Sequence, residues 1–224
     1  SIASSMHLFP SLNAIALNIR RGTFFKTAYW YCAMLPKKKA LATIDGLVYS
    51  RAVLRWKFYR WGKIKKQYQR EYEKVARMPD FLTPFVYVPL HMQPERSTSV
   101  QGDIFTDQIL MLDMLSAALP KGWVLYVKEH PAQWTARRAH LGRYHGYYKR
   151  IASIRNVVCV PAHTPSSELI RKARAVATIT GTAVWEAVLN GVPALMFGYE
   201  WYMHCEGIFR ASSAEEARKA LAKI

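Results

Sequence analysis

From residue 85 to the C-terminus, short runs of β-branched and aromatic residues alternate with segments that carry apolar residues at helical spacing. The runs predict buried strands at residues 85–90, 123–127, 157–160, 175–179 and 193–197. The intervening and following segments predict helices at residues 104–119, 166–173, 182–189 and from 213 onward, with a basic helical region at 135–154. This alternation favours parallel βαβ units with right-handed crossovers, and therefore a doubly wound, Rossmann-like α/β sheet.

Polar residues directly follow two of the predicted strands, and ligands of such sheets bind outside the carboxyl ends of the strands. His130 follows the second strand, where a histidine can donate a hydrogen bond to a phosphate. The turn formed by Thr180, Gly181 and Thr182 follows the fourth strand and suits an anion. Glu186, one helical turn further, is placed to reach a ribose hydroxyl. The alternatives are a histidine without a ligand, an ordinary helix cap and an amphipathic surface.

The segment after the first predicted strand holds a histidine and several acidic residues, which suits the positioning of a sugar, a base or a nucleophile. His91, Gln93 and, after the second strand, Glu129 are candidate sugar or loop contacts. Glu95 and Asp107 are the candidate catalytic carboxylates. The alternative is a solvated loop, in which Asp107 stabilises the start of the next helix.

The first third of the chain is strongly basic. Residues 1–78 contain 16 Lys and Arg against 3 acidic residues, so they carry 16 − 3 = +13 of the net charge of +17. Residues 50–78 resemble one long basic helix. We therefore expect residues 1–80 to form a basic, aromatic, mostly helical segment, the remnant of an incomplete N-terminal domain, and residues 81–224 to form a Rossmann-like nucleotide-binding domain.

Composition excludes several classes of protein. Hydrophobic residues make up 51% and aromatic residues 13%, whereas wholly disordered chains are poor in both. The three cysteines are widely spaced, so we expect no metal site and a reducing compartment. No run of about 18 uncharged apolar residues predicts a membrane-spanning helix. Because the chain starts at Ser1 without the pattern of a secretory signal, we interpret its start as a truncation.

Four segments, residues 87–95, 107–108, 127–133 and 179–187, resemble in order the motifs of the capsule and surface-carbohydrate biosynthesis family. That family is similar to retaining Kdo transferases and, more distantly, to bacterial sialyltransferases and polysialyltransferases with a His-Pro motif. The resemblance implies the C-terminal half of a GT-B glycosyltransferase, in which two Rossmann-like domains face each other across a cleft. Catalysis is then expected of the full-length enzyme, of which this chain is a part.

The resemblance also implies a substrate and partners. The donor is expected to be a nucleotide-activated sugar, CMP-linked and Kdo-like, and no covalently bound cofactor is expected. By motif, His130, Thr180 and Thr182 would contact the donor phosphate, and Glu186 would face the ribose. A lipid-linked glycan is the expected acceptor. A cytoplasmic enzyme, peripheral on the anionic inner face of the bacterial cytoplasmic membrane, would have a use for the basic segment.

Another class of function stays open. A non-catalytic module of capsule export could bind nucleotide or polysaccharide through the same residues without turnover. Nucleic acid is not an expected partner, because the basic segment has no recognisable nucleic-acid-binding motif.

Overall fold

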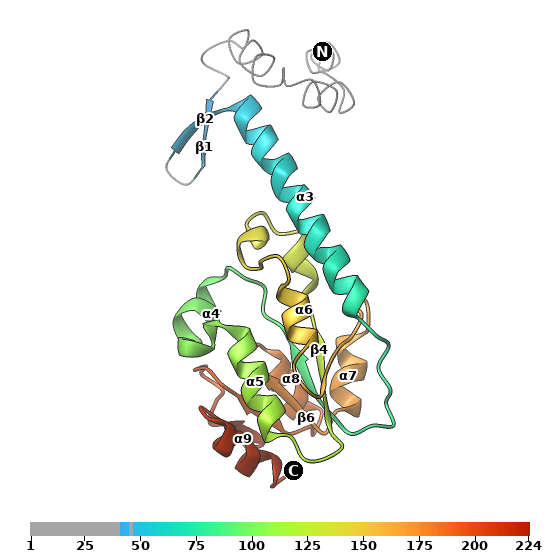
Figure 1. Cartoon of the computed structure of the whole chain (residues 1–224). Helices are drawn as coiled ribbons and strands as arrows, with labels where there is room; N and C mark the ends of the chain where they lie inside the picture. Colours follow the sequence, from blue (N-terminus) through green and yellow to red (C-terminus); the bar gives the residue numbers. More distant parts are fainter. Residues whose placement is uncertain (1–40, 45–46) are drawn as a thin grey trace. The chain divides into compact units, whose positions relative to one another are not determined.

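The computed structural model describes residues 41–44 and 47–224 of the chain (Figure 1). The chain divides into two compact units at Gly62, which lies within helix α3 (Arg51–Val75). In the first unit, β1 (Leu41–Ile44) and β2 (Leu47–Ser50) form an antiparallel hairpin. The long basic helix predicted at residues 50–78 is present as α3, whereas the hairpin was not predicted. The prediction for residues 1–40 lies outside the described residues.

The second unit contains a six-stranded parallel sheet with the order β5-β4-β3-β6-β7-β8. Its strands are β3 (Phe85–Pro89), β4 (Val124–Lys128), β5 (Val157–Cys159), β6 (Ala175–Thr178), β7 (Ala194–Met196) and β8 (Ile208–Arg210). This is the strand order of the Rossmann fold, so the predicted Rossmann-like α/β class is confirmed. The edge strand β8 was not predicted, because its three residues are only partly buried or exposed and lack a strong apolar pattern.

The predicted helices of the second unit are present but shorter than the sequence predicted, and α4 (Arg96–Gln101) lies in a segment that was expected to be a loop. Helix α4 is followed by α5 (Gln108–Ala118), α6 (Tyr147–Ala152), α7 (Ser166–Lys172), α8 (Ala183–Leu189) and α9 (Ala214–Leu221), with 3-10 turns at Asp103–Thr106, Pro131–Trp134 and Ala139–Leu141. The helix predicted at 104–119 begins at Gln108, because the Asp107 side chain caps it. The basic region 135–154 forms a regular helix only in α6, after Gly146 at φ 85°.

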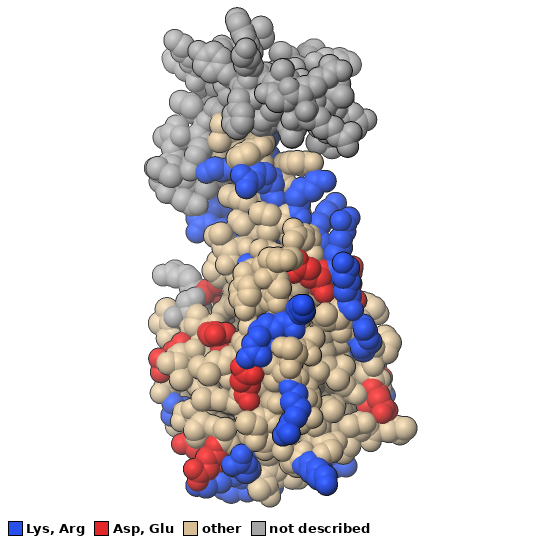
Figure 2. Space-filling view, in the orientation of Figure 1, with Lys and Arg blue, Asp and Glu red and all other residues tan. Residues whose placement is uncertain are grey.

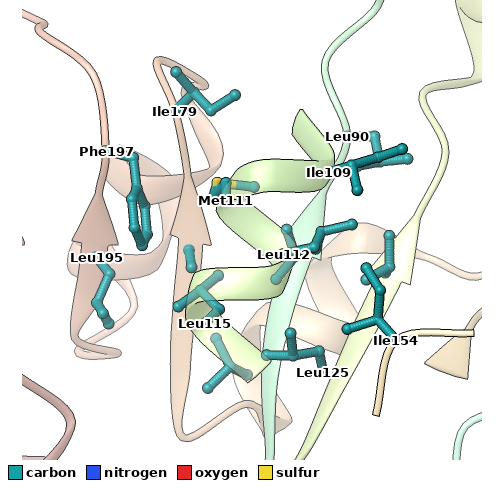
Figure 3. Close-up of a cluster of buried hydrophobic side chains, with 14 of the residues drawn as sticks. Leu90, Ile109, Met111, Leu112, Leu115, Leu125, Ile154, Ile179, Leu195 and Phe197 are labelled. Atoms are coloured by element: carbon teal, nitrogen blue, oxygen red, sulfur yellow. The ribbon is translucent and has the colours of Figure 1, made fainter. Parts of the chain in front are cut away.

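Side chains that alternate along the strands form two apolar layers. Val86 and Val88 of β3 pack with α5, α6, α9 and the second half of α3 on one face of the sheet. Figure 3 shows Leu112 and Leu115 of α5 in this layer. Phe85 and Tyr87 point to the other face and pack with α7 and α8. The sheet is therefore covered on both faces, and its accessible parts are its edges and the loops at the ends of its strands.

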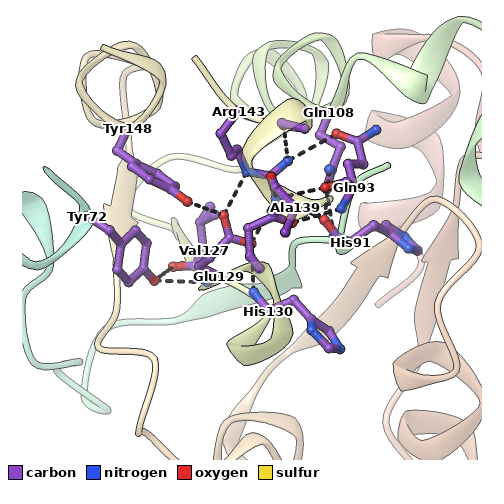
Figure 4. A network of polar contacts seen from close by, with 12 residues as sticks. Tyr72, His91, Gln93, Gln108, Val127, Glu129, His130, Ala139, Arg143 and Tyr148 are labelled. Carbon is purple, nitrogen blue, oxygen red and sulfur yellow. Dashed lines mark hydrogen bonds and ion pairs between the residues drawn. The ribbon is translucent and has the colours of Figure 1, made fainter. Parts of the chain in front are cut away.

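Tyr72 of α3 links this helix to the carboxyl ends of two strands. Its side chain is 1% exposed. Its hydroxyl accepts the N–H of Glu129 at 3.0 Å and lies 3.3 Å from the carbonyl oxygen of Val127 (Figure 4). It also donates to the carbonyl of Val160. A single side chain thus satisfies backbone groups that follow β4 and β5.

We predict that Tyr72→Phe lowers the free energy of unfolding by about 1–3 kcal/mol, because it leaves a buried N–H and a buried carbonyl without this partner. Urea denaturation measures the change. Tyr68→Phe, one turn earlier on the same helix and only partly buried, is the control and should change stability much less. Equal stability of the two variants would contradict the structural role of the Tyr72 hydroxyl.

Candidate functional site

The winding of the sheet changes direction between β3 and β6, and the polar side chains of this edge meet there. His91, two residues after β3 ends at Pro89, is 8% exposed. Its Nε2 lies 2.8 Å from Thr178 Oγ1 and accepts the N–H of Thr180 at 3.3 Å. Because Nε2 accepts from a backbone N–H, the neutral ring carries its proton on Nδ1, which faces Glu95 Oε1 at 3.3 Å. The ring therefore joins the loop after β3 to the turn after β6.

The turn after β6 approaches His91 so closely that only glycine fits at position 181. A Cβ atom on Gly181 would lie 2.8 Å from Thr178 Oγ1 and 3.2 Å from His91 Cε1. Thr180 Oγ1 is buried and has no hydrogen-bond partner among the described residues. Thr182 is exposed, and its side chain does not cap α8. The alternative interpretation of this turn as an ordinary side-chain cap is therefore not what the structure shows.

His130 lies at the carboxyl end of β4 and is exposed (Figure 4). Its Nδ1 accepts the N–H of Ala132 at 3.1 Å, which fixes the ring against the following 3-10 turn. In the neutral ring the proton must then be on Nε2. The arrangement presents an N–H donor to solvent at the edge where ligands of this fold bind.

A buried polar cluster lies next to His130 (Figure 4). Arg143 Nε and Nη2 donate to the two carboxylate oxygens of Glu129 at 2.8 and 2.9 Å. The same carboxylate accepts from Tyr148 at 2.6 Å and from the N–H of His130 at 2.7 Å. Burial opposes the charge on Arg143, and the attraction of Glu129 outweighs it and raises the pKa of the guanidinium. Glu129, a predicted sugar or loop contact, is completely buried, and in this structure its carboxylate holds the loop residue Arg143.

Lys128, the last residue of β4, is a polar site residue that the sequence did not single out. Its side chain is 6% exposed, and its Nζ donates to the carbonyl of Thr164 at 2.9 Å and to Ser166 Oγ. Burial lowers the pKa of Lys128. The available signal was its position, directly before the Glu129-His130 pair at a strand end.

The two predicted catalytic carboxylates have different surroundings. Glu95 is partly buried and accepts from Thr98 Oγ1 at 2.5 Å, in addition to facing His91. Asp107 is exposed and caps α5 by accepting the N–H of Ile109 at 3.0 Å, as its alternative interpretation predicted. The structure therefore brings Glu95 to the site at the β3–β6 boundary and places Asp107 at the start of α5.

Gln93 and Glu186 complete the predicted set. Gln93 donates to the carbonyl of Thr106 at 2.7 Å and accepts from Arg143 at 3.1 Å, so its side chain supports the loop after β3. Glu186 is exposed on α8. Burial raises the pKa of Tyr87, and the charge of Glu186 raises it further, whereas the hydrogen bond with Ser166 lowers it. Among the described residues, no group of three or more His, Cys, Asp or Glu side chains could hold a metal ion.

These features define a Rossmann-like α/β protein with a polar site at the point where the winding of its sheet reverses. The chain belongs to the family described as "Capsule polysaccharide biosynthesis protein", whose pattern matches residues 26–223. The predicted resemblance to this family is thus confirmed.

Comparison with solved structures gives several similar folds at low sequence identity. The β-Kdo 2,4 transferase KpsC of Thermosulfurimonas dismutans has a TM-score of 0.48 and 15% identity over 80% of this chain and 57% of its own. The β-Kdo 2,7 transferase KpsC of the same organism has a TM-score of 0.45 and 17% identity over 71% of this chain and 53% of its own. The UDP-GlcNAc 2-epimerase of Methanocaldococcus jannaschii has a TM-score of 0.44 and 12% identity over 74% of this chain and 44% of its own. The chain therefore spans about half the length of each of these proteins. Among curated proteins, no sequence matches.

We predict that Arg143→Met lowers the free energy of unfolding by about 3–5 kcal/mol, because it leaves the buried Glu129 carboxylate without its counter-charge. Chemical denaturation measures the loss. Arg150→Met is the control: its ion pair with Asp113 has side chains 48% and 40% exposed, and its removal should cost about 0–1 kcal/mol. A similar loss in both variants would contradict the special role of the buried pair.

Proposed function

We propose that this chain is the nucleotide-binding part of a glycosyltransferase of capsule polysaccharide synthesis that uses a CMP-activated, Kdo-like sugar. Membership of the capsule polysaccharide biosynthesis family supports the biological role. The two KpsC proteins of similar fold are Kdo transferases. By the interpretation of its motifs, this chain would be the C-terminal half of a GT-B enzyme and would need a facing domain for transfer.

The observation that carries the proposal is the contact of His91 with the Thr180–Thr182 turn at the β3–β6 boundary. This contact fixes two loops against each other where ligands of doubly wound sheets bind. Thr180 Oγ1 is left buried without a protein partner among the described residues, which suits a ligand oxygen. The exposed His130 Nε2 supplies a further donor from the end of β4.

The proposed chemistry is stabilisation of a leaving phosphate. Cleavage of a CMP-sugar places negative charge on CMP and positive charge on the sugar. Fixed donors such as His130 Nε2 and the Thr180 and Thr182 hydroxyls would bind the phosphate more tightly as that charge develops. Glu186, exposed on α8, would accept hydrogen bonds from the ribose.

Within this proposal, Glu95 acts through His91. Its carboxylate accepts from Thr98 and faces His91 Nδ1, so it holds the tautomer in which Nε2 can accept the N–H of Thr180. Glu95 is thus a positioning residue in the geometry of this chain. Asp107 keeps an exposed carboxylate while it caps α5.

The competing proposal is a capsule-export module that binds nucleotide or polysaccharide without turnover. The engagement of Glu95 by Thr98 and His91 favours this alternative, because it leaves Asp107 as the candidate carboxylate available for chemistry. Full-length protein that bound CMP but never released it from a CMP-sugar in the presence of a glycan acceptor would support the export module over the transferase.

We predict that isothermal titration calorimetry shows CMP binding in preference to UDP and GDP. His130→Ala should weaken CMP binding by about 1–3 kcal/mol, the range for a hydrogen bond to a charged group. His145→Ala is the matched control, since this histidine is 81% exposed and pairs with Glu71. Preference for UDP would reject the CMP donor. Unchanged affinity in a folded His130→Ala protein would reject the role of that residue.

The charge of α3 leads to a second proposal, that the protein associates with an anionic membrane surface. The helix carries nine Lys and Arg against two Glu, and Figure 2 shows basic side chains along it. Phe58 and Tyr59 are 41% and 42% exposed between these charges. Basic and aromatic side chains together suit the headgroup zone of anionic lipid. Within the described part of the chain, no helix is both long and apolar enough to cross a membrane.

We predict that the protein floats with anionic vesicles at low salt and is released as salt rises, because salt screens surface attraction. Arg60→Glu combined with Lys66→Glu should abolish flotation. The control reverses Lys121 and Lys223, two exposed lysines outside α3, and should float like the wild type if the helix is the contact. If the protein does not bind anionic vesicles at low salt, the proposal of membrane association is wrong.

A further inference from the structure

The loops that follow β3 and β4 line an open pocket of about 440 Å³, separate from the contact between His91 and the Thr180–Thr182 turn. Its walls include Gln93, Asp107, Leu141, Arg143, Tyr144 and Tyr147. Ligand sites in proteins commonly range from about 300 to 1,000 Å³, so this space is large enough for a sugar ring. The pocket has no role in the function proposed above.

The Tyr147 hydroxyl is the feature of this pocket that points to a ligand. The side chain is 5% exposed, yet its hydroxyl has no hydrogen-bond partner among the described residues. Burial of an unsatisfied hydroxyl is unfavourable, and native proteins rarely leave one in place. Burial is the largest effect on the pKa of Tyr147 and raises it. The charge of Arg143 lowers this pKa, and the charges of Glu129 and Asp107 raise it further. The hydroxyl therefore stays protonated and can both donate and accept.

The charges of the pocket select against an anionic ligand. Among the lining side chains that the structure describes, Arg143 is the one cation, and all five of its guanidinium N–H donors are already directed to protein acceptors. Asp107 contributes a carboxylate, of which Oδ1 accepts the N–H of Ile109. The described walls of the pocket therefore offer hydrogen-bond acceptors and no uncommitted positive charge, which suits neutral hydroxyl groups.

An aromatic ring supplies the apolar contact that a sugar ring needs. Tyr144 is 54% exposed, and its ring stands at 90° to that of Tyr147 with the centroids 5.3 Å apart. The C–H groups of a pyranose can pack on such a ring while its hydroxyls reach the polar wall. Carboxylate, hydroxyl and aromatic ring thus line one pocket.

We propose that this pocket binds one neutral sugar residue, with Asp107 and Tyr147 hydrogen-bonded to its hydroxyls and Tyr144 packed against its ring. Its identification as a residue of the acceptor glycan rests on the proposed function. The binding itself does not, because it depends only on the residues of the pocket. The site would distinguish a neutral acceptor sugar from the acidic sugar of the donor.

Saturation-transfer difference NMR on the whole chain tests this directly. The probes are methyl glucoside, methyl galactoside and N-acetylglucosamine, with glucuronate as the acidic counterpart of glucose. We expect saturable binding of at least one neutral sugar and weaker binding of glucuronate than of methyl glucoside. Absence of binding by all three neutral probes, or tighter binding of glucuronate, overturns the proposal.

Variants assign the binding to this pocket. Tyr147→Phe should weaken sugar affinity about fivefold without lowering the stability of the protein, because the lost hydroxyl has no protein partner. Asp107→Asn, which can still cap α5, should weaken it about tenfold.

Tyr126→Phe is the control: its hydroxyl bonds Asp80, and its ring packs in the apolar layer on the α7 and α8 side of the sheet. It should lower stability and leave sugar affinity unchanged. Unchanged sugar affinity in folded Tyr147→Phe and Asp107→Asn overturns the site.

CMP calorimetry on the same samples separates this inference from the proposed function. Tyr147→Phe should retain the CMP affinity of the wild type while its sugar affinity falls. CMP binding without sugar binding rejects the pocket alone. Sugar binding without nucleotide binding supports the pocket and rejects the nucleotide-binding function.

Discussion

The buried ion pair between Glu129 and Arg143 is the interaction on which the carboxyl edge of the sheet depends. Both side chains are inaccessible to solvent, and transfer of each charge from water costs several kcal/mol. Only a complete set of partners offsets that cost. Glu129 has a complete set of partners, because its carboxylate accepts hydrogen bonds from Arg143, from Tyr148 and from the N–H of His130. The pair therefore demands that three separate parts of the chain be in place together.

The remaining donors of Arg143 extend this constraint to the loop after β3. They bond the carbonyl of His91 at 2.9 Å and the side-chain oxygen of Gln93 at 3.1 Å. His91 in turn contacts Thr178 and the N–H of Thr180 after β6. A continuous hydrogen-bonded path thus joins the loops that follow three neighbouring strands. Side chains held in this way suit a ligand site, since precise geometry needs support from the surrounding shell.

Two candidate sites share this support. The turn of Thr180 and the ring of His130 present donors, which suit a phosphate, whereas the pocket at Tyr147 and Asp107 presents acceptors to neutral hydroxyls. In a transferase, such a division would keep the charged leaving group apart from the glycan that receives the sugar. Arg143 contributes to both candidate sites, because its guanidinium supports the loop of His91 and the residue also lines the pocket.

The sequence by itself determined the class of fold. Alternating apolar runs and helical periods are local properties, so they predicted five of the six parallel strands, the long basic helix and the edge where His91, His130 and Thr180 gather. Only the tertiary structure decided which polar residues are buried. Glu129 and Asp107 look equally available in the sequence, yet one is buried by Arg143, which lies 14 residues away, and the other caps α5. Partnership between distant side chains decides burial, and no local pattern encodes it.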